Sequence, residues 1–125
     1  MISVFATTTR KSYEWVRDIG EALSLDDTAA YIALRASLHA LRDRLPTQEA
    51  VHLGAQLPML LRGMYYDGWM PDKTPIGVRD LEGFLAYVRA RAGNLSIMDE
   101  TEEMVRGVLR VLSERVTRGE LDNIA

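Results

Sequence analysis

The sequence predicts an all-α fold, a compact bundle of about six helices, and three observations support this. Apolar residues recur at helical spacing through every long segment, prolines and glycines fall between these segments, and capping residues precede several of them. The alternation of apolar and polar residues that is typical of strands is absent, apart from a short extended stretch at 75–78. With 125 residues, the chain has the length of one domain.

Two helices are expected before the first internal proline. The first begins after the threonine run at 7–9, because any of these hydroxyls can cap it, and it ends near Leu23. The stretch "SLDD" at 24–27 resembles a capping sequence for the second helix. Leucines at 34, 38, 41 and 45 of that second helix follow steps of four, three and four, which predicts one apolar stripe.

Prolines divide the next segment into two shorter helices. Pro46 ends the second helix, and Thr47 is expected to cap a third that runs to about Gln56. Pro58 suits the first turn of a fourth helix, which ends near Tyr66. The segment "GWMPDKTP" at 68–75 is the clearest loop of the chain, since it contains two prolines and a glycine.

The remaining residues predict further helices with recognisable caps. Asp80 can cap a helix that reaches about Ala92, with Gly93 just past its end. The stretch "DETE" at 99–102 is expected to cap another helix, which continues to about Val116. A capping box, "TRGE" at 117–120, opens a last helix.

The two halves of the chain resemble each other. At an offset of 71 positions, the leucines at 34, 38, 41 and 45 align with apolar residues at 105, 109, 112 and 116, and Arg35, Arg44 and Glu49 align with identical residues. We therefore predict a single domain, 1–125, built by internal duplication, with half one at about 7–70, a loop at 68–79 and half two at about 80–125. The alternative is that any two amphipathic helices align in this way.

Composition and charge disfavour several classes of protein. The net charge is −3 with a pI near 5.4, and the arginines are interleaved with acids, so nucleic-acid binding is disfavoured. The absence of cysteine excludes disulfides, thiol nucleophiles and iron–sulfur ligation. No apolar run reaches the length of a membrane span, and the first residues do not have the pattern of a signal peptide. We expect a cytoplasmic protein that does not contact the membrane.

No pattern of catalytic or metal-binding residues is recognisable. His39 and His52 fall on different predicted helices, so they lack the spacing of four that places two ligands on one helix face. Acidic pairs sit at helix starts, where capping explains them, and Arg42 and Arg44 near a helix end suit the helix dipole. The sequence has neither a glycine-rich phosphate loop nor a Gly-x-Ser-x-Gly motif. We predict no catalytic residue, no metal and no cofactor.

The candidate binding residues are Arg62, Tyr65, Tyr66 and Trp69, within "LLRGMYYDGWM". In a structural interpretation, the aromatic residues dock the first half on the second, and Trp69 is buried. In a functional interpretation, tyrosine, tryptophan and arginine together have the composition of a binding hot spot. Arg62 can pair with Asp67 or offer its guanidinium group to an anionic ligand.

Residues 38–69, "LHALRDRLPTQEAVHLGAQLPMLLRGMYYDGW", resemble a bacterial family catalogued as domain of unknown function 2267. The resemblance extends over nearly the whole chain through "FATTTRKSYEWVRDI" and "DLEGFLAYVRARAG". It implies an all-helical, duplicated bacterial protein without an assigned activity, so no catalytic residue is carried over. Family members often end with a second leucine–proline step, and its absence here leads us to expect a missing C-terminal turn.

Two functions from different classes follow as expectations. The first is a non-enzymatic protein that binds a protein partner or a second copy of itself, in a regulatory or stress setting. The alternative is a small-ligand binder or enzyme that uses a pocket between the halves, near Arg62, Tyr65 and Tyr66. Helix-based DNA binding is a third hypothesis, which the acidic pI disfavours.

Overall fold

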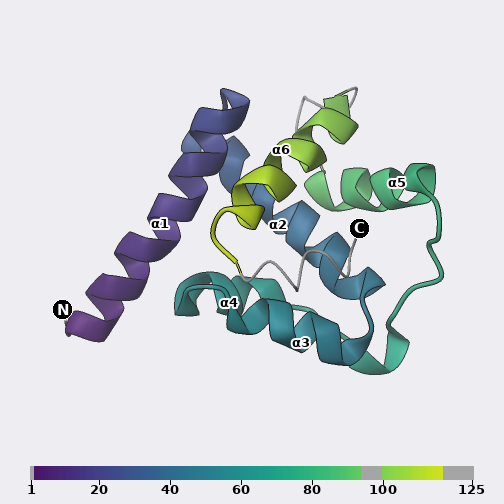
Figure 1. Cartoon of the computed structure of the whole chain (residues 1–125), viewed down its shortest axis with the longest axis horizontal. Helices are drawn as coiled ribbons and strands as arrows, with labels where there is room; N and C mark the ends of the chain where they lie inside the picture. Colours follow the sequence, from purple (N-terminus) through teal and green to yellow (C-terminus); the bar gives the residue numbers. More distant parts are fainter. Residues whose placement is uncertain (1, 94–99, 117–125) are drawn as a thin grey trace.

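The all-α prediction is confirmed by the computed structural model, which describes residues 2–93 and 100–116 (Figure 1). This part of the chain contains no strand, and residues 75–78 form no sheet pairing. Its elements are α1 (Ser3–Leu23), α2 (Asp27–Arg44), α3 (Thr47–Ala55), α4 (Met59–Tyr66), the 3₁₀-helix η1 (Pro71–Lys73), α5 (Leu81–Ala92) and α6 (Thr101–Ser113). None of these helices is long and apolar enough to cross a bilayer.

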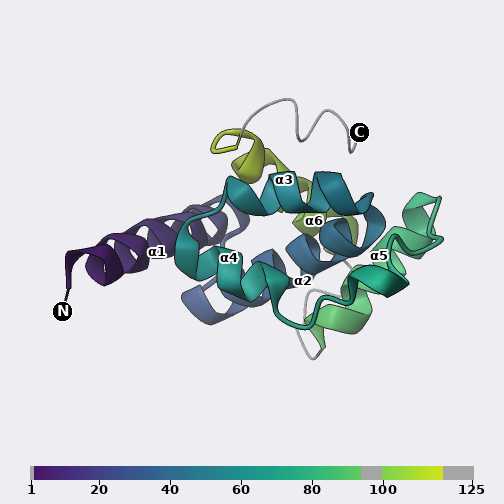
Figure 2. The same cartoon turned by 90° about the horizontal axis from the view of Figure 1, so that it is seen from below.

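The second helix, α2, is the centre of the fold and packs against each of the other five α-helices (Figures 1 and 2). Its predicted leucine stripe is buried, and Leu34, Leu38 and Leu41 are almost fully covered. Alanines at 30, 33, 36 and 40 are buried as well, and their small side chains let neighbouring helices approach closely. All residues from 36 to 43 are buried, which covers every side of the helix there and places this part of α2 inside the bundle.

The predicted start of the first helix is wrong, because α1 begins at Ser3 and contains the threonine run. The hydroxyl of Thr8 accepts a hydrogen bond from the backbone N–H of Leu60, at 2.9 Å. That N–H belongs to the first turn of α4, where backbone donors have no partner inside the helix. Thr8 therefore caps α4 across the fold and does not cap its own helix.

The stretch at 24–27 does cap α2, and its capping residue is Asp26, whereas Ser24 belongs to the end of α1. Ser24 ends α1 in the left-handed conformation, with φ of 58°. The carboxylate of Asp26 accepts a hydrogen bond from the N–H of Ala29 at 2.9 Å, so Asp26 is the N-cap of α2. Gly20 allows this tight junction, because a Cβ there would lie 2.8 Å from the carbonyl oxygen of Leu25.

The other helix boundaries agree with the sequence to within a few residues. Pro46 and Pro58 precede α3 and α4, although Thr47 forms no capping hydrogen bond. Asp80 caps α5 as predicted, since its carboxylate accepts from the N–H of Gly83 at 2.8 Å. Helix α6 ends at Ser113, three residues before the predicted Val116.

The predicted cap at Asp99 and the predicted helix from 117 lie outside the described residues. The internal duplication stays a prediction.

Candidate functional site

Arg42 is the centre of a buried polar cluster. Its side chain is 1% exposed, and its guanidinium group donates to the backbone carbonyls of Tyr65 (2.7 Å) and Asp67 (2.9 Å) and to both carboxylate oxygens of Asp43 (2.8 and 3.2 Å). These bonds attach the end of α4 to α2. Arg42 lies in the last turn of α2 as expected, but its hydrogen bonds show a further role that the helix dipole does not explain. No local signal in the sequence separates Arg42 from Arg44, because each lies three or four positions after a leucine of the stripe.

The carboxylate of Asp43 connects α2 to α5. It also accepts hydrogen bonds from the hydroxyl of Tyr87 and from the guanidinium group of Arg91, the latter at 3.0 Å. Burial alone would raise the pKa of Asp43, but the hydrogen bonds from Arg42 and Tyr87 and the charges of Arg42 and Arg91 outweigh it and lower the pKa. The carboxylate is therefore held in its charged form inside the protein. The hydrogen bonds of this cluster join α2 to α4 and α5, so we interpret its role as structural.

His39 lies beside this cluster and is 1% exposed. Its Nε2 lies 2.8 Å from the carbonyl oxygen of Met64, so Nε2 carries the proton in the neutral ring. Within the described residues, Nδ1 is buried without a hydrogen-bond partner. Burial lowers the pKa of His39 to about 4, and the charges of Arg42, Arg35 and Arg91 lower it further against the opposing effect of the Met64 bond.

We expect His39 to make stability depend on pH below neutrality. Because the pKa falls from 6.5 in the unfolded chain to about 4 in the native state, the unfolded state binds the proton first as the pH falls. The stabilisation is complete above pH 6.5, is lost progressively towards pH 4, and amounts to about 3 kcal/mol. Urea unfolding between these values should therefore show a smaller pH dependence for His39→Gln, whose amide can still donate to Met64. Equal pH dependence of the two proteins would contradict the assignment.

Arg62 does not form the predicted pair with Asp67. Its guanidinium group donates to the backbone carbonyls of Gly54 (3.1 Å) and Leu57 (3.0 Å) and to that of Ala55. These carbonyls lie at the C-terminal end of α3, where helix acceptors lack partners inside the helix. The carboxylate of Asp67 lies instead 3.7 Å from the guanidinium group of Arg35.

The three aromatic residues of the predicted site contact one another in chain order, with an edge-on contact between Tyr65 and Tyr66 and a tilted one between Tyr66 and Trp69. Tyr65 is fully buried and its hydroxyl donates to the carbonyl of Ala50 at 2.7 Å. Its ring centre lies 5.0 Å from that of Tyr66, which lies 5.4 Å from that of Trp69. Trp69 is only partly buried and donates to the hydroxyl of Thr74 at 3.3 Å. The expectation that Trp69 is buried between the halves is therefore wrong, and Tyr65 is the buried residue that anchors this stretch on α3.

These contacts favour the structural interpretation of the aromatic stretch, in a modified form. The hydrogen bonds of Tyr65 and Tyr66 reach α3 in the same half of the chain. Gly54 of α3 makes room for both rings, because a Cβ at this position would overlap Tyr66. Polar links between the predicted halves come from Asp43 with Tyr87 and Arg91, and from Asp18 with Arg115. A ligand-binding role for Arg62, Tyr65, Tyr66 and Trp69 stays a prediction.

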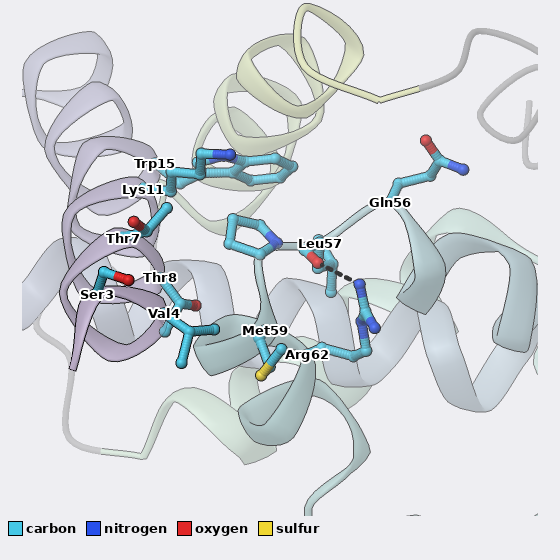
Figure 3. A pocket seen from close by; sticks show the side chains of 11 residues that line it. Ser3, Val4, Thr7, Thr8, Lys11, Trp15, Gln56, Leu57, Met59 and Arg62 are labelled. Carbon is cyan, nitrogen blue, oxygen red and sulfur yellow. Dashed lines mark hydrogen bonds between the residues drawn. The ribbon is translucent and has the colours of Figure 1, made fainter.

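A cleft of about 610 Å³ separates the first turns of α1 from the junction between α3 and α4 (Figure 3). Val4, Trp15 and Met59 give it apolar walls, and Lys11 with several hydroxyl groups gives it a polar edge. Arg62 also lines the cleft, but Figure 3 shows its side chain turned towards the carbonyl of Leu57. Among the described residues, no group of three histidine, aspartate or glutamate side chains could hold a metal ion.

Large apolar side chains stand exposed around the contact between α1 and α4, and we call this surface the α1–α4 face. Its members are Ile2, Phe5, Tyr13, Tyr31 and Leu60, whereas the exposed Val4 and Met59 line the cleft of Figure 3. The first turns of α1 project beyond the rest of the bundle (Figures 1 and 2), and there Ile2 is 62% and Phe5 56% exposed. A groove of about 360 Å³ opens on the same face, between Tyr13 on α1, Tyr31 on α2 and Leu60 on α4.

The sequence did not identify the α1–α4 face. Phe5 and Ile2 precede the expected first helix, and their exposure depends on where α1 leaves the bundle. The helical spacing of apolar residues in α1 predicts the helix, but it does not tell which apolar residues the rest of the fold covers.

The sequence of this chain matches the model of one known protein family. Residues 12–125 match the model of a family described as uncharacterized conserved protein (DUF2267). No curated protein matches the chain. Because the match extends over nearly the whole sequence, the resemblance seen in residues 38–69 is confirmed, and the chain belongs to the DUF2267 family of uncharacterized conserved proteins.

Proposed function

We propose that this chain is a non-enzymatic, self-associating protein whose α1–α4 face binds the same face of a second copy. The observation that carries the proposal is the projection of the first turns of α1, with Ile2 and Phe5 exposed, beside a groove on the same face. Exposed apolar side chains that gather on one surface commonly mark an interaction site.

The projecting part of α1 has little support from its own chain. Residues 2–7 are all exposed, and a helix of a few turns is marginal in water without tertiary packing. The hydrogen bond between Thr8 and Leu60 follows these residues in α1, so it does not hold the first turns themselves. A second copy would supply the missing packing along these first turns.

A twofold interface must be self-complementary, and a projection beside a groove on the same face is one way to meet that requirement. Phe5 precedes Tyr13 by eight residues, which is about 12 Å along a helix. If two α1 helices run antiparallel with the twofold axis at Thr9, Phe5 of each copy lies against the groove beside Tyr13 of the other. Thr9 lines the groove and is exposed, so the two helices can approach there.

The charges near this contact do not oppose it. Arg10 and Glu14 directly follow Thr9 and Tyr13 on α1 and pair with each other, with 3.7 Å between their charged groups. A second copy therefore approaches without an uncompensated like charge at this position.

We expect the full chain to form dimers in sedimentation equilibrium, and Phe5→Glu or Leu60→Glu to convert them to monomers. A carboxylate in an apolar interface loses its hydration, which disfavours association. Both positions are more than half exposed in one copy, so the folded state should tolerate the change, which far-ultraviolet circular dichroism can verify.

Met70→Glu is the matched control, because Met70 is 54% exposed but lies in the loop after α4. A wild-type chain that stays monomeric throughout the micromolar range would contradict the proposal. Equal dissociation by Met70→Glu would also contradict it. A Phe5-dependent complex with a different protein, found in place of the dimer, would assign the face to another partner.

Small-ligand binding is a second candidate, and the cleft in Figure 3 favours it. Its volume of about 610 Å³ falls in the usual range for ligand sites, and it combines apolar walls with the amino group of Lys11. Native mass spectrometry of protein purified from its host should then show a retained small molecule that Lys11→Gln no longer retains. The regulatory or stress setting stays a prediction.

A further inference from the structure

A separate pocket lies between the end of α2, the start of α5 and α6, away from the α1–α4 face. Its volume is about 400 Å³, within the range of ligand-binding sites. Leu41, Leu85 and Val105 form a buried apolar floor, and the half-buried Phe84 and Leu109 extend it towards the surface. The three helices that surround the pocket are visible in Figure 1.

Three arginines line the same pocket: Arg44, Arg79 and Arg106. The two acids that line it are already engaged, because Glu102 pairs with Arg106 at 2.8 Å and Asp80 caps α5. Within the described residues, neither Arg44 nor Arg79 forms an ion pair or a side-chain hydrogen bond. Two guanidinium groups are therefore available beside an apolar floor.

We propose that this pocket binds an amphipathic anion, an apolar chain that ends in a carboxylate or phosphate group. A guanidinium group presents paired N–H donors that match the oxygens of either anion. The apolar floor selects a ligand with a hydrocarbon part, since burial of that part removes apolar surface from water. The helix dipole accounts for Arg44 at the end of α2, but it does not account for Arg79, which precedes α5.

Isothermal titration calorimetry of the full chain with decanoate, below the micelle concentration, tests this proposal. We expect saturable binding with one site per chain, and no saturable binding of decanol, which has the same tail without the charge. Decyl phosphate distinguishes the two anions, because tighter binding of one of them identifies the head group.

The double variant Arg44→Gln/Arg79→Gln should weaken anion binding at least about tenfold, since hydrogen bonds to charged groups are the stronger class. Arg17→Gln/Lys73→Gln removes the same charge from α1 and η1, outside the pocket, and should leave binding unchanged. Absence of saturable binding by both anions would overturn the proposal. Equal binding of decanol, or equal weakening in the two double variants, would overturn it as well.

Discussion

Replacement of Arg42 by methionine should lower the free energy of unfolding by about 3–5 kcal/mol, the usual cost of removing one partner from a buried ion pair. The change leaves the carboxylate of Asp43 inside the protein without its closest cation. It also leaves the backbone carbonyls of Tyr65 and Asp67 without their donor. Chemical denaturation monitored by circular dichroism measures the loss.

Arg44→Met is the matched control, because Arg44 lies two residues further along the same helix and its side chain is only half-buried. We expect it to change stability by less than about 0.5 kcal/mol, as is usual for surface positions. Similar denaturation midpoints for Arg42→Met and the wild type would show that the buried cluster does not stabilise the fold.

The second large effect is expected at Tyr65, where alanine should cost about 3–5 kcal/mol. Tyr65 is fully buried, and its ring packs against Gly54 and Tyr66, so its removal leaves a cavity between α3 and α4. Tyr65→Phe keeps the ring and loses only the bond to Ala50, which should cost about 1 kcal/mol.

Trp69→Ala provides the comparison within the same aromatic stretch. Trp69 is partly exposed, so its removal should cost clearly less than removal of Tyr65. If Trp69→Ala proved the more destabilising change under the same denaturation conditions, the assignment of Tyr65 as the anchor would be wrong.

The sequence predicted the helices well because their signals are local. The leucine spacing in α2, the prolines before α3 and α4, and the Asp80 cap each act within a few residues. The start of α1 was missed for a tertiary reason. The hydroxyl of Thr8 bonds to α4, a partner 52 positions away, so a residue that usually caps its own helix lies inside it.

The polar residues were harder to interpret than the helices. Arg62 and Asp67 are near in sequence, which suggested an ion pair. The guanidinium group of Arg62 instead donates hydrogen bonds to backbone carbonyls at and just after the end of α3. Arg42 and Arg44 look alike in sequence, yet one is 1% exposed and the other half-buried. Helix phase does not separate them, because Arg42 lies four positions after one leucine of the stripe and Arg44 lies three positions after another. Their difference is tertiary, since the end of α4 supplies carbonyl acceptors to Arg42.

The chain lacks cysteine, and this permits a direct measurement of the proposed twofold contact. A single Thr9→Cys substitution would place one thiol at the proposed axis, where the two α1 helices approach most closely. A disulfide forms only when the two Cα atoms come within about 7 Å. Arg17→Cys, further along α1 and also exposed to solvent, is the control.

Under mild oxidation, we expect Thr9→Cys to give a covalent dimer on a non-reducing gel at micromolar protein concentration, and Arg17→Cys to stay largely monomeric. That result would place α1 against α1 in the associated state. If Thr9→Cys gave no dimer, or if both variants cross-linked to the same extent, self-association through the α1–α4 face would be contradicted.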